Sequence, residues 1–166
     1  MRNEKVSLGL FVPADATVLC AGDQDPEHRR WFDFPPDFRP SIEHSLNVIT
    51  RWQQERIEGK RFTFAIRDSV TDQLLGGCEL RPLDGTTANV SYWTYPTHRR
   101  RGVATRAVAL LRGVAFEEFG FLRLDIVTHP DNVGSRQVAL RNGFKEVGLR
   151  EGCILYALYA QRNPVV

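Results

Sequence analysis

The chain has few sulfur-containing residues. Three of its 166 residues are cysteines, Cys20, Cys78 and Cys153, and it has one methionine. The cysteines are odd in number and scattered, with neither C-x-x-C spacing nor a nearby histidine, which argues against a disulfide framework and against a zinc site. We therefore expect reduced, mostly buried thiols in a cytoplasmic protein that binds no metal.

Long apolar runs are also missing. A membrane span needs about 18 or more consecutive apolar residues, and the most apolar stretch, 103–119, is broken by Arg106 and Arg112. The short apolar run at 6–12 contains Gly9, and no small-residue cleavage pattern follows it. We expect neither a membrane protein nor a secretory signal.

The excess of one charge is small as well. Lys and Arg number 22 against 20 Asp and Glu, a net charge of +2. This balance, without a sustained basic stripe interleaved with aromatic residues, argues against nucleic acid as a partner. Basic residues cluster only at 98–101, directly before Gly102. A run this short is usually solvated surface, so its neighbours must decide its role.

What is present is typical of a soluble globular protein. Hydrophobic residues make up 42% and charged residues 25% of a chain whose length suits one domain. There is no repeat, no low-complexity segment and no linker long enough to separate two domains. We therefore predict a single domain over residues 1–166.

Local patterns predict alternating strands and helices. Ser41 is a candidate N-cap, and apolar residues at helical spacing predict a helix over 41–59. Gly120 is expected to end a second long helix. The other predicted elements are strands at 61–66, 74–83, 88–95 and 122–126, helices at about 100–119 and 132–141, and a closing hairpin to about 162. This order predicts an α/β fold with a mixed, mostly antiparallel twisted sheet of about seven strands and helices packed on it.

The strand-loop-helix junction at 93–105 is where we expect the chemistry. A helix N-terminus carries unpaired N–H groups and a partial positive charge, which bind phosphate when side chains leave the approach open. Gly102 and Ala104 keep it open, and three consecutive arginines add charged donors. No Lys-Ser or Lys-Thr pair follows the glycine, so a pyrophosphate without magnesium fits better than the P-loop of nucleotide hydrolases.

These residues resemble a known family. The segment 99–104, RRRGVA, matches the R/Q-x-x-G-x-G/A motif of the GNAT superfamily of acyl-CoA-dependent N-acetyltransferases. The segment 91–96, SYWTYP, resembles the fourth strand of its RimJ/RimL branch, which acetylates protein N-termini. Asn132-x-x-Ser135 followed by 141–144, RNGF, resembles that branch's second motif. The resemblance covers roughly 61–162 and implies the GNAT fold, whereas the first 60 residues, where the family builds its acceptor site, match only loosely.

The resemblance implies a cofactor site for acetyl-CoA. Trp93 and Thr94 would lie on a strand that diverges from its neighbour and pairs with pantetheine, and Asn132 would bond the pantetheine arm. Thr105 would cap the phosphate side. The pyrophosphate would be held by the backbone amides of Arg99, Arg100, Arg101, Gly102, Val103 and Ala104.

The resemblance also implies a proton donor for the departing thiolate. Many members carry a Tyr seven residues after the motif's Asn, but here that position is Ala139, so the role falls to Ser135 or to water. Both motif residues have ordinary alternatives. Asn132 would serve as a helix N-cap and Ser135 as a first-turn residue.

The acceptor must be a neutral amine when it attacks the thioester carbonyl. At pH 7 roughly 10% of an α-amine is neutral, but under about 0.1% of a lysine side chain. The strand at 86–95 holds no Asp, Glu or His, which favours a weakly basic amine such as an α-amine. Glu79 on the neighbouring strand is the second catalytic candidate, as a base or as the holder of a proton-carrying water. A solvent-facing carboxylate is its alternative.

Other side chains carry weaker hypotheses. His98 and His129 lie beside the cofactor motifs and are alternatively loop residues, and Tyr156 and Tyr159 line the acceptor channel or pack in the core. The loop 27–38 is dense in aromatic residues, so it should cover something, either as a lid on the acceptor site or against another subunit in a homodimer. Its Asp33 and Asp37 would suit a cationic acceptor.

Three functions are compatible with these patterns. The first is direct transfer of acetyl, within a ternary complex, to the α-amine of a protein or peptide. The second is the same chemistry on a small amine such as an amino sugar, a polyamine or an amino acid. The third is a catalytically silent acyl-CoA-binding module.

Overall fold

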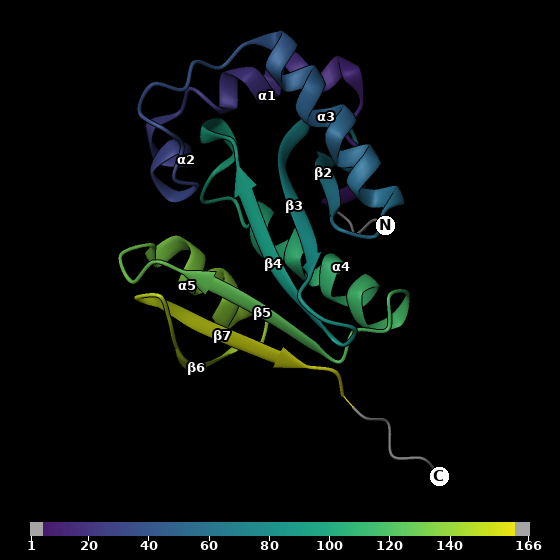
Figure 1. The fold of residues 1–166 in the computed structure, drawn as a ribbon, viewed down its shortest axis with the longest axis vertical. Coiled ribbons are helices and arrows are strands. Elements are labelled where there is room, and N and C mark those ends of the chain that lie inside the picture. The colour runs from purple at the N-terminus through teal and green to yellow at the C-terminus, as the bar shows by residue number, and fades with distance from the viewer. Residues whose placement is uncertain (1–4, 162–166) are drawn as a thin grey trace.

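The computed structural model describes residues 5–161 and contains one seven-stranded sheet with helices on both faces (Figure 1). The strand order is β1-β2-β3-β4-β5-β7-β6. Neighbouring strands are antiparallel except β4 and β5, which are parallel. The strands are β1 (Val6–Gly9), β2 (Phe62–Asp68), β3 (Leu74–Pro82), β4 (Thr87–Thr94), β5 (Arg123–Thr128), β6 (Lys145–Arg150) and β7 (Cys153–Tyr159). The predicted mixed, mostly antiparallel sheet is confirmed.

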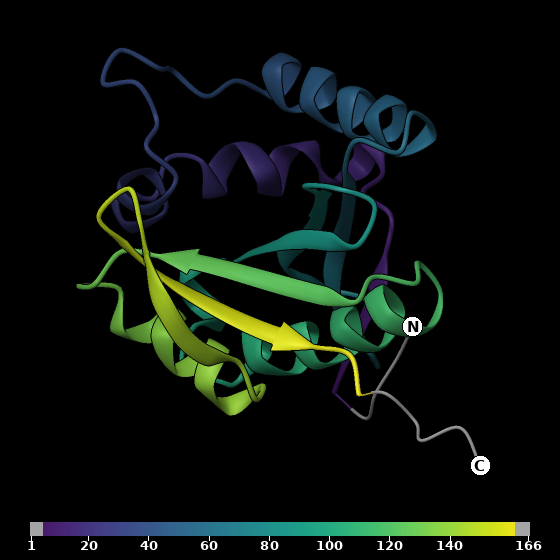
Figure 2. The same cartoon turned by 60° about the horizontal axis from the view of Figure 1, so that its bottom comes forward.

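The helices form two layers, which Figure 2 shows above and below the sheet. On one face lie α1 (Ala16–Gly22), α2 (Pro26–Trp31) and α3 (Ile42–Ile57). On the other lie α4 (Val103–Glu117) and α5 (Val133–Arg141), and two short 3-10 turns span Pro13–Asp15 and Pro96–His98. Between residues 5 and 161, no helix is long and apolar enough to cross a membrane.

Helix ends follow the local chemistry that the sequence contains. The hydroxyl of Ser41 accepts a hydrogen bond from the backbone N–H of His44 at 3.0 Å, so Ser41 caps α3 as predicted. The helix predicted from about residue 100 begins only at Val103, because Gly102 is left-handed with φ +72°. Gly120, with φ +71°, follows the C-terminal end of α4.

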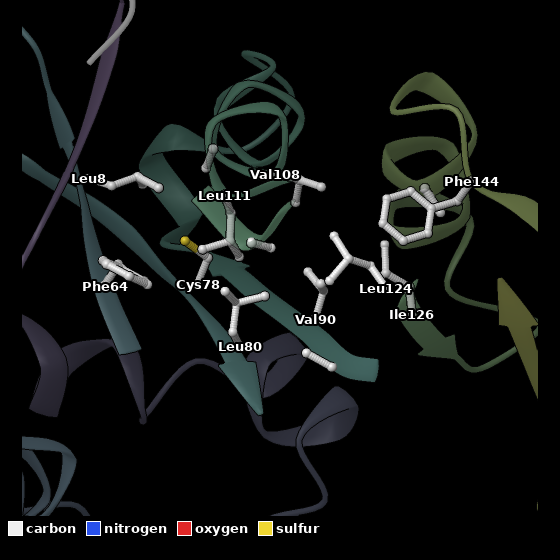
Figure 3. Packing of buried hydrophobic residues seen from close by; sticks show 14 of the residues in the cluster. Leu8, Phe64, Cys78, Leu80, Val90, Val108, Leu111, Leu124, Ile126 and Phe144 are labelled. Atoms are coloured by element: carbon white, nitrogen blue, oxygen red, sulfur yellow. The ribbon is translucent and has the colours of Figure 1, made fainter. Parts of the chain in front are cut away.

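The main core lies between α4, α5 and the sheet (Figure 3). Val108 and Leu111 of α4 point toward Leu80 and Val90 of the central strands, and all four are at most 3% exposed. The thiol of Cys78 lies in this core, where burial raises its pKa. All three cysteines are free, as predicted, and Cys20 is also buried.

A second cluster covers the opposite face of the sheet. Trp93 of β4 packs there with Leu19 of α1 and Ile49 of α3. Successive side chains of a strand point to opposite faces, so the preceding residue, Tyr92, packs against the main core instead. β4 therefore contributes side chains to two different environments.

β4 and β5 pair over only part of their length. The parallel ladder joins Thr87, Ala88 and Asn89 to residues 123–125, although β4 continues to Thr94. Figure 1 shows the two strands starting side by side and then diverging. Along residues 90–94, β4 pairs with β3 on one side and has no strand partner on the other side within the described chain. Its outer backbone groups can therefore pair with a ligand.

Candidate active site

The N-terminus of α4 is an open anion site. Gly102 occupies the N-cap position, and the first turn has no side-chain cap. The first helical bond to Gly102 is donated by the N–H of Arg106 at 3.1 Å. The amides of Val103, Ala104 and Thr105 have no protein acceptor among residues 5–161, which fits a phosphate group.

Two of the three arginines before Gly102 remain available for that anion. The side chains of Arg100 and Arg101 form no ion pair with the described residues. Arg99 differs from the expectation, because its guanidinium is ion-paired with Asp25 and with Glu27, the latter at 2.8 Å. The two carboxylates lie at the start of α2, so the Arg99 side chain connects α2 to the loop before Gly102. It is therefore not a free donor for the polyanion.

Asp25 makes two contacts where α2 meets the loop before Gly102. It caps α2 by accepting from the N–H of His28 at 2.8 Å while it pairs with Arg99. Partial burial raises the pKa of Asp25. The hydrogen bonds from Arg99 and His28, together with their positive charge, outweigh burial and hold the pKa below its usual value.

Asp25→Asn isolates the ion pair, because asparagine caps helices as well as aspartate does. A carboxyl whose pKa is lowered on folding stabilises the protein above its unfolded pKa and loses that contribution as pH falls through the folded pKa. We expect the variant to unfold with about 1 kcal/mol less free energy at pH 7. The difference should shrink as pH falls below about 4, measured by urea unfolding across pH. A difference that stays constant down to pH 3 would contradict the pairing.

The second motif contains a linked pair of hydroxyls. Asn132 Oδ1 accepts from the N–H of Ser135 at 3.0 Å, so its reading as a helix N-cap is confirmed. The Ser135 hydroxyl lies 2.9 Å from the hydroxyl of Tyr92, which also donates to the Ser135 carbonyl at 3.0 Å. Burial raises the pKa of Tyr92 to about 12, so this hydroxyl keeps its proton at neutral pH. Tyr92 was not among the predicted site residues, although strand alternation places it on the α5 side of β4.

A cavity of about 180 Å3 lies between α1, α2, α3 and the face of β3 and β4. Trp93 lies against Gly77 of β3, where an added Cβ would lie 2.1 Å from the indole ring. The predicted acceptor region of the first 60 residues supplies most of the walls. The lining residues are Leu19, Asp23, His28, Phe32, Phe34, His44, Val48, Arg51, Trp52, Arg61, Glu79, Arg81 and Trp93.

The aromatic loop covers this cavity with Phe32 and Phe34, as the lid hypothesis expects. Its helix α2 also reaches the end of β5, where the ring of Trp31 lies 5.8 Å from that of His129. The loop's own acids are not the ones on the cavity. Asp23 and Glu79 line it, whereas the predicted Asp33 and Asp37 do not.

Glu79 is buried in the cavity wall, so the solvent-facing alternative is wrong. It is 6% exposed, and Nη2 of Arg81 donates to its Oε1 at 3.0 Å. Its Oε2 lies 3.6 Å from Nη1 of Arg61. The carboxylate is thus held between two guanidinium groups.

Glu79→Gln leaves those two guanidinium groups facing a neutral amide. Both arginines are partly exposed, so we expect the free energy of unfolding to fall by about 1 to 2 kcal/mol, between the values of surface and buried pairs. Urea unfolding measures the loss. The control is Glu117→Gln, an exposed carboxylate that forms no ion pair with residues 5–161, and an equal change in both variants would contradict the role assigned to Glu79.

Four further candidates lie away from the cavity. Tyr156 is 1% exposed and accepts from Nε of Arg136 at 3.3 Å, so it packs in the core. Tyr159 is 59% exposed, and His98 and His129 do not line the cavity either. The histidines that do line it are His28 and His44, which no local sequence pattern singled out.

Comparison with known proteins identifies the fold and the chemistry. Residues 5–145 match the family model described as the acetyltransferase (GNAT) domain. This chain belongs to the GNAT acetyltransferases. It is 25% identical over 148 residues to the N-acetyltransferase p20 of Bacillus licheniformis, covering 88% of this chain and 82% of that protein.

The comparisons also found a second curated relative and a solved structure with a similar fold. Over 88 residues the chain is 32% identical to the ribosomal-protein-serine acetyltransferase of Escherichia coli strain K12, covering 52% of this chain and 47% of the relative. The structure of Mycobacterium smegmatis RimJ in complex with CoA-disulfide superposes with a TM-score of 0.82, at 21% identity, covering 96% and 84% of the two chains. The predicted family and enzyme class are confirmed.

GNAT acetyltransferases use acetyl-CoA, and the geometry of this one fits the coenzyme. The uncapped amides at the start of α4 suit its pyrophosphate, and the unpaired edge of β4 suits the amide groups of its pantetheine arm. Both features are built from backbone atoms.

Proposed function

We propose that this GNAT acetyltransferase acts in the cytoplasm on the α-amine of a protein or peptide N-terminus. The observation that carries the proposal is the cavity behind Trp93. Its volume of about 180 Å3 lies below the about 300 to 1,000 Å3 of sites that enclose a drug-sized ligand. It suits the terminal residue of a longer acceptor whose remainder lies outside.

The walls suit an amine that arrives positively charged. Asp23 carries negative charge that no guanidinium group of the described residues neutralises, and the rings of Phe32, Phe34 and Trp93 line the same cavity. Arg51 and Arg81 are exposed at the cavity, where they can contact the rest of a peptide. The names of the relatives, a ribosomal-protein-serine acetyltransferase and RimJ, agree with this acceptor class.

The cofactor would be held by the other side of β4. The amides of Val103, Ala104 and Thr105 and the side chains of Arg100 and Arg101 would bind its pyrophosphate. The edge of β4 at Trp93 and Thr94 would pair with pantetheine, and the free amide of Asn132 would bond it. Acetyl-CoA supplies the activated acetyl group as a thioester.

Ser135 would donate the proton that the departing sulfur needs. Its hydroxyl contacts that of Tyr92, which remains protonated at neutral pH, so Tyr92 can return a proton to Ser135. The two hydroxyls thus form a short proton-donating chain across the gap between β4 and α5. The Tyr that many GNAT enzymes use is replaced by Ala139 here, which leaves this role open.

A small amine is the second candidate acceptor. The observation in its favour is the lid itself, because Phe32 and Phe34 from one loop cover a cavity that a single amino sugar or amino acid could occupy. A peptide needs an opening beside these rings, whereas a small amine does not.

The test combines binding with product analysis. Acetyl-CoA at about 100 times its dissociation constant should stabilise the protein by about 2.7 kcal/mol in a thermal melt. Mass spectrometry then follows a mixture of free-amine hexapeptides, glucosamine and spermidine. Acetylated peptide supports the proposal and acetylated small amine supports the second candidate. A stabilised protein that acetylates none of these probes contradicts both.

A further inference from the structure

The cavity wall contains a histidine paired with an aspartate. Nε2 of His28 lies 3.5 Å from Oδ1 of Asp23, and their side chains are only 11% and 9% exposed. Both residues line the cavity, and the ring of His28 lies 6.2 Å from that of Trp93 on β4. The pair therefore lies beside the strand that borders the proposed thioester site.

The local fold fixes this pair in place. Asp23 ends α1, with its N–H donating to the carbonyl of Leu19 at 3.0 Å. Asp25 starts α2 by accepting from the N–H of His28, so only one residue separates the end of α1 from the cap of α2. The imidazole ring packs 4.6 Å from the ring of Phe32 and 5.6 Å from that of Phe34. A ring held this way needs little reorganisation to act on a bound amine.

We propose that His28 accepts the proton of the incoming ammonium group and that Asp23 positions it. The proposal rests on the proposed transfer of acetyl to an α-amine. It assigns the general base that would remove a proton from this amine, a group that the strand at 86–95 lacks. Asp23 lies on the Nε2 side, 3.5 Å from that nitrogen, where it can hold the orientation of the ring. Across residues 5–161 no protein group bonds Nδ1 of His28, which leaves that nitrogen for the substrate.

The other titratable groups on the cavity suit this task less well. Both oxygens of Glu79 already face guanidinium groups, and His44 has no carboxylate partner in the described part of the chain. Asp25, on the same turn of α2, is paired with Arg99. Asp25 accepts a hydrogen bond from the backbone N–H of His28. The charged and titratable groups that line the cavity together with His28 are Asp23, His44, Arg51, Arg61, Glu79 and Arg81.

The step balances without a further reactant. The acceptor enters as R–NH3+ and gives one proton to His28, which releases it to solvent. The neutral nitrogen then bonds to the acetyl carbon and the carbon–sulfur bond breaks. The nitrogen then loses its second proton to solvent. Ser135 gives its proton to sulfur and regains one from solvent through Tyr92, so the products are the N-acetyl amide, the free thiol of the coenzyme and one net H+.

A histidine base also selects the acceptor class. The ordinary pKa of a histidine is about 6.5, that of an α-amine is about 7.7 to 8.0 and that of a lysine side chain is about 10.4. The equilibrium for proton transfer to a histidine is therefore unfavourable by about 15- to 30-fold from an α-amine and by about 10⁴-fold from lysine. We expect α-amines to be acetylated far faster than lysine side chains.

His28→Gln tests the role with acetyl-CoA and the hexapeptide that the wild-type enzyme acetylates. We expect kcat/KM for the peptide to fall about 10²-fold at pH 7, with acetyl-CoA affinity unchanged. The pH profile of the wild type should contain one ionisation that the profile of the variant lacks, because only the wild type has an imidazole at this position. The rate of the variant should keep rising up to about pH 8, where the amine itself becomes neutral.

His129→Gln is the matched control. His129 also pairs with an aspartate, Asp131 at 3.7 Å, and also packs on a ring of α2, but it lies outside the cavity. We expect wild-type kcat/KM and pH profile for this variant. If His28→Gln fails to fold, Asp23→Asn replaces it and should lower kcat/KM about tenfold with acetyl-CoA affinity unchanged.

The outcomes separate this inference from the proposed function. A wild-type enzyme that acetylates none of the amines overturns both. An active enzyme whose pH profile is unchanged by His28→Gln, or is lost in Glu79→Gln instead, overturns the role of His28 and leaves the function standing. A fall in kcat/KM without a change in the pH profile assigns His28 to packing, which also overturns the proposal.

Discussion

Gly102→Val is expected to abolish binding of acetyl-CoA. Gly102 has φ +72°, which a β-branched residue does not adopt without strain, and a Cβ there would lie 3.0 Å from Nη1 of Arg106. The side chain would stand over the amides of Val103 and Ala104, where the pyrophosphate is proposed to bind. The stabilisation of about 2.7 kcal/mol by saturating coenzyme should therefore disappear from the thermal melt.

Gly113→Val is the control for this experiment. Gly113 lies in the same helix, has no positive φ, and a Cβ there would meet nothing within 4 Å. We expect this variant to keep the stabilisation by acetyl-CoA. Isothermal titration provides the second readout, because it reports affinity even if Gly102→Val lowers the melting temperature of the free protein. Unchanged affinity in Gly102→Val would remove the start of α4 from the cofactor site.

Ser135→Ala should lower kcat about 10²-fold, the lower end of what a positioned proton donor contributes. Affinity for acetyl-CoA should stay the same, because the pyrophosphate and pantetheine contacts lie elsewhere. Tyr92→Phe should produce a smaller loss of kcat, since Ser135 keeps its own proton but loses the hydroxyl at 2.9 Å that can replace it. Steady-state rates with saturating acetyl-CoA and peptide measure both effects.

A serine outside the site controls for the chemistry of the substitution. Ser7 lies on β1, opposite Arg67 of β2, and Ser7→Ala should leave kcat unchanged. Wild-type turnover in Ser135→Ala would remove Ser135 from the reaction. A loss in Tyr92→Phe larger than in Ser135→Ala would instead make Tyr92 the direct proton donor.

Local chemistry explains why the centre of the fold could be predicted from the sequence. Ser41 caps α3 through a hydrogen bond to a residue three positions away, and the β2–β3 hairpin joins neighbouring segments. Gly102 is similar, because its left-handed conformation and its place before an apolar helix are properties of one short segment. Such features depend on residues that are close in the chain.

The features that the sequence did not predict depend on contacts between distant segments. β1 has four residues, and α1 and α2 have seven and six, which is too short for a periodic pattern. Arg99 pairs with Asp25 across 74 positions of sequence, so nothing near residue 99 reveals that its side chain is taken. Tyr92 and Ser135 meet across 43 positions.

The cavity that we propose as the acceptor site also depends on contacts between distant segments. Its acids were expected at Asp33 and Asp37 because the loop 27–38 contains them, but the cavity uses Asp23 and Glu79. Glu79 was a candidate because it lies on the strand next to the one that carries Trp93. His28 is buried beside Phe32 and Phe34, aromatic residues of a loop whose position only the folded chain defines. The set of residues that line this cavity therefore becomes visible only in the folded chain.

A peptide that carries both an α-amine and a lysine side chain tests the proposed acceptor directly. A decapeptide with a free α-amine and a single internal lysine is incubated with the enzyme and acetyl-CoA, and the product is fragmented in the mass spectrometer. We predict one acetyl group, located on the N-terminal residue. An acetyl group on the lysine, or a peptide left unmodified by an enzyme that binds acetyl-CoA, would contradict the proposed acceptor.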